Sequence, residues 1–200
     1  MPSLMLARLN RETKQHHAAA DADRLQLLSS ATSVSYVRCL SRIWGFEAPI
    51  EGVLARTHGL GDVVDLRRRT HIRRLRADLA VLGMKSPSWL PYCRTVPAFQ
   101  LAEALGWMYV VEYSTMLHGE LRRHLGKRIP TQLASAGTYL AVGERSVAVR
   151  LGELGVALDG LASDAETAAR IVESANIAFG RQRQWFAQPS SIARRPIQVA

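Results

Sequence analysis

The sequence predicts an all-α protein built as a single domain. Apolar residues recur at helical spacing along the chain, and no stretch alternates apolar and polar residues as a half-buried β-strand would. The length of 200 residues suits one domain that buries a core of its own. We therefore expect a multi-helix bundle over residues 1–187, followed by a polar, basic and disordered tail over residues 188–200.

Capping residues, glycines and prolines divide the chain into expected helices. Ser3 can cap a first helix that runs to about Leu28. A second helix runs from about Ser33 to Ala55, and Pro49 must kink or break it. Further helices, giving six to eight in all, are expected to carry the arginine run and end near residue 83, to centre on 104–124, and to span about 131–140, 143–161 and 163–185, with loops at 59–61 and 85–97.

Residues 104–124 are expected to form the centre of the fold. From Phe99 to Leu117 the chain is apolar on almost every face, and a helix that is apolar all round must be buried on all sides. Buried polar groups need partners, from the protein or from a ligand. Neighbouring side chains satisfy such groups in an ordinary core helix, and a ligand does so in a binding site. The polar side chains that raise this question are Glu112, Tyr113, Ser114, Thr115 and His118.

The formal net charge of the chain is +9. Much of it lies in an arginine-rich run over residues 67–76, and a second group comprises Arg122, Arg123 and Lys127. Such a surface can attract polyanions. No aromatic residue is interleaved with the run, as stacking on nucleic-acid bases would require. We therefore interpret the run as a solvated helix face and expect no nucleic-acid partner.

The sequence also bears on compartment. No apolar run is long enough and free enough of charge to span a bilayer, since Glu103 and Glu112 interrupt the longest one. The first residues lack the apolar core of a signal peptide. Two cysteines, Cys39 and Cys93, give neither a disulfide framework nor a metal-binding spacing. We expect a cytoplasmic protein without a membrane partner.

The first expected helix carries Leu9, Thr13, His17 and Asp21 at four-residue spacing. This pattern resembles the proximal helix of heme oxygenases, Leu-x-x-x-Thr-x-x-x-His-x-x-x-acid. Four further segments resemble the bacterial members of that family in the same order, and together they extend the resemblance over residues 5–187. The nearest branch is the one found beside bacterial phytochromes, which use biliverdin. The four segments are Tyr36-x-x-x-Leu40 with Pro49-Ile-Glu51, Leu75-Arg-Ala-Asp78-Leu79 with Leu82-Gly83, residues 104–115, and residues 171–179.

The resemblance implies a heme-oxygenase-like domain over residues 1–187, with heme as both substrate and cofactor. The family opens the heme ring at one meso carbon with O₂ and electrons, and it releases biliverdin, carbon monoxide and iron. Heme supplies the difficult chemistry, while the protein supplies the iron ligand, dryness and orientation. The resemblance further implies an electron donor such as a ferredoxin or a reductase, and it leaves a bacterial phytochrome open as a partner.

The resemblance also assigns roles on the first helix. By motif spacing the iron ligand is His17, although helical geometry alone does not separate it from His16. Asp21 stands one turn later, where it could orient the imidazole. Arg11 is a candidate for binding the heme carboxylates, and a solvated surface arginine is the alternative.

On the later helices, Ser114, Thr115 and Gly119 fall where the family covers the other heme face and holds bound oxygen. Arg150 is the second candidate for the heme carboxylates. Spacing alone does not separate it from Arg145, and each of the two is otherwise a surface arginine.

The central stretch departs from the family pattern Gly-Ser-Thr-Leu-Gly-Gly, because Tyr113, Leu117 and His118 replace the three glycines. Glycine permits the close backbone approach that heme needs, so large side chains crowd this wall. Three outcomes follow. The helix shifts so that Gly119 serves and the enzyme is active; Tyr113 or His118 reaches the iron; or Tyr113 and Leu117 fill the pocket.

Two functions therefore remain open from the sequence. The first is a heme oxygenase that forms biliverdin. The second is a degenerate binding or regulatory protein of the same fold, which holds heme without turnover or holds no heme. A di-metal protein is a minor alternative, since Glu120 and His124 lack the Glu-x-x-His spacing of such sites.

Overall fold

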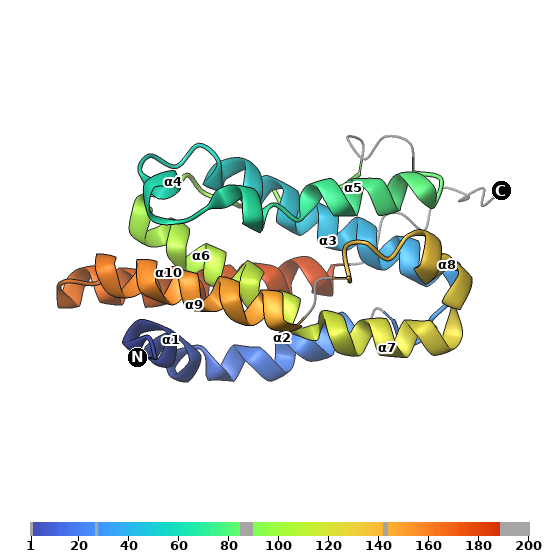
Figure 1. Cartoon of the computed structure of the whole chain (residues 1–200), viewed down its shortest axis with the longest axis horizontal. Helices are drawn as coiled ribbons and strands as arrows, with labels where there is room; N and C mark the ends of the chain where they lie inside the picture. Colours follow the sequence, from blue (N-terminus) through green and yellow to red (C-terminus); the bar gives the residue numbers. More distant parts are fainter. Residues whose placement is uncertain (1, 27, 85–89, 142–143, 189–200) are drawn as a thin grey trace.

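The computed structural model describes residues 2–26, 28–84, 90–141 and 144–188, with the side chains of 144 and 145 left out. These residues form helices and loops without a β-strand, so the all-α, single-domain prediction is confirmed (Figure 1). The helices are α1 (Leu4–Glu12), α2 (Lys14–Gln26), α3 (Ser33–Leu54), α4 (Leu60–Val63), α5 (Ile72–Val81), α6 (Leu101–Ser114), α7 (His118–Arg128), α8 (Pro130–Ser135), α9 (Glu144–Leu161) and α10 (Ala165–Ala187), with 3₁₀ turns η1 (Leu66–Arg69) and η3 (Thr115–Leu117).

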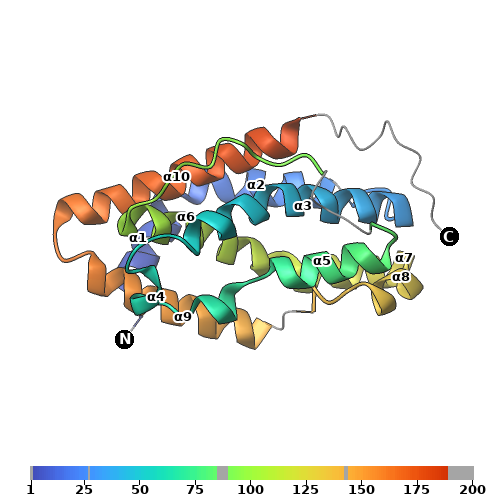
Figure 2. The ribbon, with the colours of Figure 1, turned by 90° about the horizontal axis from the view of Figure 1, so that it is seen from above.

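Helix α6 is the centre of the bundle, as its apolar sequence predicts. It packs against α10, α9 and α3, and Figure 2 shows it between α10 and α9. Gly106 permits the closest approach, because a Cβ atom there would lie 2.5 Å from the Ile171 carbonyl oxygen of α10. Helix α2 packs along α10 as well. The central stretch therefore has α2 and α10 on one side and α3 and α9 on others.

Helix α3 continues through Pro49, so of the two expected outcomes, a kink or a break, the break does not occur. Proline lacks an N–H, which frees the carbonyl oxygen of Gly45 one turn earlier. The backbone N–H of Cys93 donates to that oxygen at 2.7 Å, so the chain after residue 90 replaces the missing hydrogen bond. Glycine at position 45 leaves room for this segment, because a Cβ atom there would collide with the Pro91 carbonyl oxygen and the Trp185 ring.

The expected first helix is two helices, divided at Thr13. The Thr13 hydroxyl donates to the carbonyl oxygen of Leu9 at 2.8 Å, a back-bond that commonly bends helices. The central stretch bends in a similar way at η3. There the hydroxyls of Ser114 and Thr115 donate to the carbonyl oxygens of Val110 and Glu112, at 2.9 and 2.7 Å. These divisions, with the short helix α4 where a loop was expected, explain why there are more helices than predicted.

The arginine run divides into η1 and α5 instead of forming one helix. Most of its side chains are exposed, as a solvated face requires, but Arg69 is buried. The loop expected over 85–97 is non-helical from residue 90, and its first five residues lie outside the described part. The expected tail also lies outside it from residue 189 onward. None of the described helices combines the length and apolarity needed to cross a bilayer.

Candidate functional site

His17 lies where α2 faces α6 and α10, and its ring is half-buried. Its Nε2 atom lies 2.9 Å from the Thr13 hydroxyl oxygen. Because the single hydroxyl proton of Thr13 is used on the Leu9 carbonyl oxygen, Nε2 is the protonated nitrogen and donates to Thr13. Burial lowers the pKa of His17, and repulsion from His16 adds to this effect. The imidazole is therefore neutral near pH 7.

Three aromatic side chains surround this imidazole, and we call the four residues the ring cluster: His17, Tyr109, Tyr113 and Phe179. Tyr113 stacks on His17 with 4.1 Å between ring centroids and 22° between planes. The centroid of Phe179 lies 5.4 Å from that of His17, and the Tyr109 hydroxyl lies 3.5 Å from Nε2. His16 does not contact Tyr113 in the same way; it stacks on Phe179 with 5.6 Å between ring centroids. The side chains of α2, α6 and α10 therefore close directly on His17.

Asp21 lies next to the Tyr113 hydroxyl. Burial raises the pKa of the Asp21 carboxyl, while Arg24 and the Tyr113 hydroxyl lower it. In turn, burial and the nearby Asp21 carboxylate raise the pKa of Tyr113 to about 12. Tyr113 is thus a neutral phenol, with the Asp21 carboxylate near its hydroxyl and the His17 imidazole stacked on its ring. The described effect of Asp21 is therefore on the pKa of Tyr113.

Another face of α6 carries Glu112, which bridges two buried arginines. Glu112 Oε1 lies 2.8 Å from Arg69 Nη1, and Glu112 Oε2 lies 2.8 Å from Arg150 Nε. Arg150 also donates to the Thr115 hydroxyl at 3.2 Å. The side chains of the three charged residues are at most 6% exposed. We call Glu112, Arg69 and Arg150 the ion network.

A second buried group lies at the start of α7. Arg24 pairs with Glu47 at 3.1 Å, and the Tyr139 hydroxyl donates to the same Glu47 oxygen at 2.8 Å. His118 packs on Tyr139 with 4.5 Å between centroids, and it is fully buried. Within the described residues neither ring nitrogen of His118 has a hydrogen-bond partner. Burial, with the charge of Arg24 as a second cause, holds the pKa of His118 well below its usual value.

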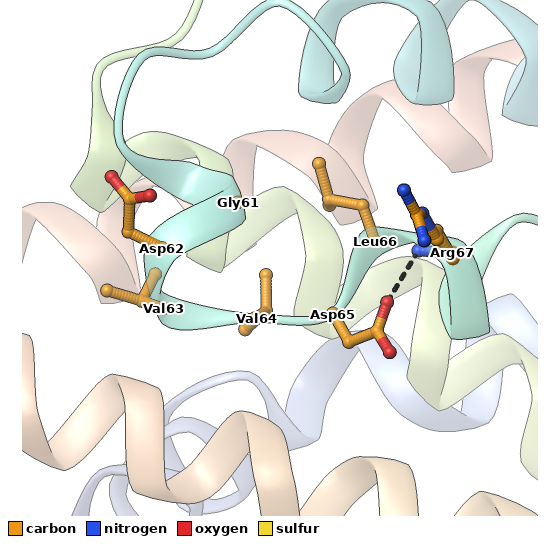
Figure 3. Close-up of a pocket in the computed structure, with 7 residues that line it drawn as sticks. All are labelled: Gly61, Asp62, Val63, Val64, Asp65, Leu66 and Arg67. Carbon is orange, nitrogen blue, oxygen red and sulfur yellow. Dashed lines mark hydrogen bonds between the residues drawn. The ribbon is translucent and has the colours of Figure 1, made fainter.

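A hollow of about 580 Å³ at residues 61–67 lies apart from these groups (Figure 3). Its most prominent polar side chain, Asp65, accepts a hydrogen bond from the backbone N–H of Arg67 at 3.0 Å and thereby caps η1. The hollow is a shallow surface depression formed by α4, η1 and the residues between them. No group of three or more His, Cys, Asp or Glu side chains among the described residues could hold a metal ion.

Comparison with known proteins gives the family to which this fold belongs. The family model described as heme oxygenase matches residues 3–188. The chain belongs to the heme oxygenase family. A search of curated proteins finds none that matches it.

The position of His17 within this heme oxygenase fold is compatible with its expected role. The two arginines expected at the heme carboxylates lie in different parts of the fold, away from His17. Arg11 is exposed on α1 and lies 3.4 Å from Glu12. Arg150 points inward to Glu112 and belongs to the ion network. The Arg145 side chain lies outside the described part of the chain. The structure thus brings neither Arg11 nor Arg150 to the ring cluster.

The residues expected to hold oxygen are also separated by the structure. Ser114 accepts a hydrogen bond from Gln182 Nε2 at 3.0 Å, and Thr115 accepts one from Arg150, so both are buried in packing contacts. Gly119 is partly buried on α7. Of the two bulky replacements considered as iron ligands, Tyr113 joins His17 and His118 joins Tyr139.

Sequence reasoning did not identify the partners in the buried groups. Glu47 was detectable in principle, because it is a charged residue among the buried apolar residues of α3. A charge in such a position requires a partner. Which charges pair depends on how α2, α3, α6 and α9 lie in space, and no motif in the sequence records that.

The group that this family implies is heme, and the residues fit it on one wall only. On α2, His17 supplies a neutral imidazole of the kind that ligates iron. On α6, the Tyr113 ring occupies the face of that imidazole, and no glycine stands at residues 113–118 to let the backbone approach. The α2 wall therefore fits heme binding, and the α6 wall does not fit the close approach that ring opening requires.

Proposed function

We propose that this protein is a heme-binding member of its family, with His17 as the iron ligand, and that it holds heme without opening the ring. The stack of Tyr113 on His17 carries the proposal. Tyr113 places a large side chain of α6 where the family pattern has a glycine, whose backbone can approach heme closely. Access to the imidazole would require Tyr113 to move away and Nε2 to leave Thr13, with the ring proton passing to Nδ1 so that Nε2 could hold iron. When bound, heme supplies the iron that the imidazole ligates.

The energies involved allow this opening. An aromatic stack contributes about 0.5–1.5 kcal/mol, and a neutral hydrogen bond contributes about 1 kcal/mol. Loss of both costs roughly 2 kcal/mol, which lowers the apparent affinity by about 30-fold without abolishing binding. The closed ring cluster is therefore an obstacle to heme and not an exclusion of it.

The hydrogen bonds made by the hydroxyls at the end of α6 and in η3 support the absence of turnover. Ser114 and Thr115 donate to the Val110 and Glu112 carbonyl oxygens, and they accept from Gln182 and Arg150. Hydroxyls committed in this way have no proton left to orient a reacting group. Catalysis depends on donors that are already aimed at the reacting atoms.

A second candidate function is the ring-opening reaction itself, giving biliverdin, carbon monoxide and iron. One observation favours it: the family match over residues 3–188. With this function would come an electron donor such as a ferredoxin or a reductase, and a bacterial phytochrome as the receiver of biliverdin.

A hemin titration followed by absorption spectra tests the binding. We expect a stoichiometric Soret band that His17→Ala abolishes and that the neighbouring control, His16→Ala, retains. Thermal unfolding of both variants checks that each is folded. A band that survives His17→Ala, or the absence of any saturable band in the wild type, would overturn the proposed ligand.

Addition of ascorbate in air then separates the two candidate functions. The proposed function expects a stable Soret band, and decay to a biliverdin absorbance would establish ring opening instead. Tyr113→Gly should raise the hemin affinity by roughly two- to tenfold, because the stack no longer has to open. Met116→Gly is the matched control. Met116 is 56% exposed on the adjoining turn, and this substitution also introduces glycine with its low helix propensity.

A further inference from the structure

A pocket of about 320 Å³ opens between α3, α6 and the segment from η1 to α5. Its walls are mainly apolar and include Leu54, Leu66, Met108 and Val111. Small-molecule sites are concave and mostly apolar, with a few polar groups that fix the orientation of the ligand, and their volumes begin near this value. The pocket contacts α6 on a different face from Tyr109 and Tyr113, so it is separate from the ring cluster.

The carboxyl group of Glu51 lies in this pocket. Its Oε1 atom accepts hydrogen bonds from the backbone N–H groups of His71 at 2.6 Å and Ile72 at 3.2 Å, at the start of α5. Among the described residues, none donates to its Oε2 atom, and no cationic side chain lies within 4.0 Å of the carboxyl group. The two hydrogen bonds therefore fix the carboxyl group while its second oxygen lacks a partner.

The other buried carboxylates nearby do have cationic partners. Glu47 pairs with Arg24, and Glu112 pairs with Arg69 and Arg150. Arg69 also lines the pocket, but its Nη1 is bound to Glu112 and its Nη2 to the Arg150 carbonyl oxygen. Glu51 is thus the exception: a half-buried acid for which the described part of the chain supplies no cation.

The charges around Glu51 favour a cation at this place. Burial is the main cause that raises the pKa of Glu51 to about 8, and the carboxylates of Glu47 and Glu112 raise it further. The backbone N–H groups of His71 and Ile72 act in the opposite direction. The His71 imidazole is neutral, because burial and Arg150 lower its pKa to about 3. A positive charge beside Glu51 would stabilise its ionised form.

We propose that this pocket binds a small primary amine with an apolar body, whose ammonium group pairs with Glu51 while its hydrocarbon part contacts Leu54, Leu66, Met108 and Val111. Binding converts the Glu51 carboxyl group to a carboxylate and releases its proton to the solvent. The site is independent of heme, and it neither requires nor excludes the function proposed above.

Isothermal titration with three molecules of one shape tests this proposal: 2-phenylethylamine, 2-phenylethanol and 3-phenylpropionate. We expect the amine to bind at least about tenfold more tightly than the alcohol, and the carboxylate to bind most weakly. Titration in buffers of different ionisation enthalpy should show release of nearly one proton per amine at pH 7. An alcohol that binds as tightly as the amine, or no binding of any of the three, would overturn the proposal.

Two variants locate the site. Glu51→Gln keeps an oxygen that can accept from His71 and Ile72 but removes the charge, so the amine should lose its advantage over the alcohol. Val111→Phe fills the pocket and should weaken both ligands. Asp62→Asn, at an exposed acid outside the pocket, is the matched control and should change neither affinity. Retention of the amine preference in Glu51→Gln would refute the pairing.

Discussion

Two faces of α6 use polar side chains in opposite ways. On the face toward α2 and α10, the ring cluster pairs the half-buried His17 and Tyr113 with the buried Tyr109 and Phe179, and it is held by stacking and by hydrogen bonds between neutral groups. On the face toward η1 and α9, the ion network is buried, and both oxygens of Glu112 are bound by arginines at 2.8 Å. One helix thus has one face whose contacts can open and another whose contacts are fixed.

The difference follows from what each face loses when it is disturbed. Separating stacked rings exposes apolar surface and neutral hydroxyls, which water then solvates at small cost. Removing one member of a buried ion pair leaves an uncompensated charge, which costs about 3–5 kcal/mol. The ion network therefore resists separation of α6 from η1 and α9, and the contacts of the ring cluster cost less to separate.

The largest effect should come from Glu112→Ala, which leaves Arg150 buried without its carboxylate and Arg69 with only Glu153 at 3.4 Å. We expect a loss of about 3–5 kcal/mol in the free energy of unfolding, measured by urea denaturation. The control is Glu103→Ala, which removes the partly exposed partner of Arg170 and should leave the urea midpoint nearly unchanged. If both variants lose the same amount, the ion network is not the fixed face.

This division of α6 could be predicted from the sequence only in part. Periodicity and breakers predicted the helices because those signals are local. The sequence left open whether Pro49 kinks or breaks its helix, because the hydrogen bond that Cys93 donates to Gly45 comes from a loop distant in sequence. Motif spacing placed His17 on the first helical segment for the same local reason. That Tyr113 lies against it depends on the separation of α2 and α6, which no local pattern encodes.

The arginine run shows the same limit. Its composition predicted a solvated face, and its exposed members agree with that prediction. Arg69 differs because η1 ends there and turns the side chain toward Glu112. Glu112 was expected to need a partner, but either a ligand or the protein could have supplied it. Only the fold shows that the protein does.

The next effect concerns pH and extends the comparison to Glu51. The pKa of this group is about 8 in the folded protein and about 4.5 when unfolded. Between these values the unfolded chain binds fewer protons, so the contribution of Glu51 to stability is complete below pH 4.5 and is lost as pH rises toward 8. The free energy of unfolding of the wild type, minus that of Glu51→Gln, should therefore fall by roughly 1 kcal/mol per pH unit from about pH 5 to pH 8.

Urea denaturation at several pH values measures this difference curve. Contributions from His71 and His118, whose pKa values are lowered, are common to both proteins and cancel in the subtraction. The difference should level off above about pH 8. A flat difference across the whole range would mean that Glu51 ionises as readily in the folded protein as in the unfolded one.

A smaller effect is expected from Tyr139→Phe on the buried side. The change removes the hydroxyl that donates to Glu47 at 2.8 Å and leaves the carboxylate with Arg24 as its described partner. Loss of a buried hydrogen bond to a charged group costs about 1.5–3 kcal/mol. The urea midpoint should fall with an unchanged m-value, whereas an unchanged midpoint would place the Glu47 carboxylate within reach of water.

The smallest effect should come from Tyr113→Phe, which makes the same chemical change on the ring-cluster side. The phenyl ring keeps its stack on His17, and the lost hydroxyl faces a half-exposed Asp21 that water can solvate in its place. We expect a change within about 0.5 kcal/mol in the free energy of unfolding. Tyr139→Phe and Tyr113→Phe each delete a phenolic oxygen. The ratio of their losses in the free energy of unfolding therefore compares the buried Glu47 group with the ring cluster directly. A loss at Tyr113 as large as that at Tyr139 would mean that the contact with Asp21 locks the cluster, and the face proposed to open for heme would then be as rigid as the ion network.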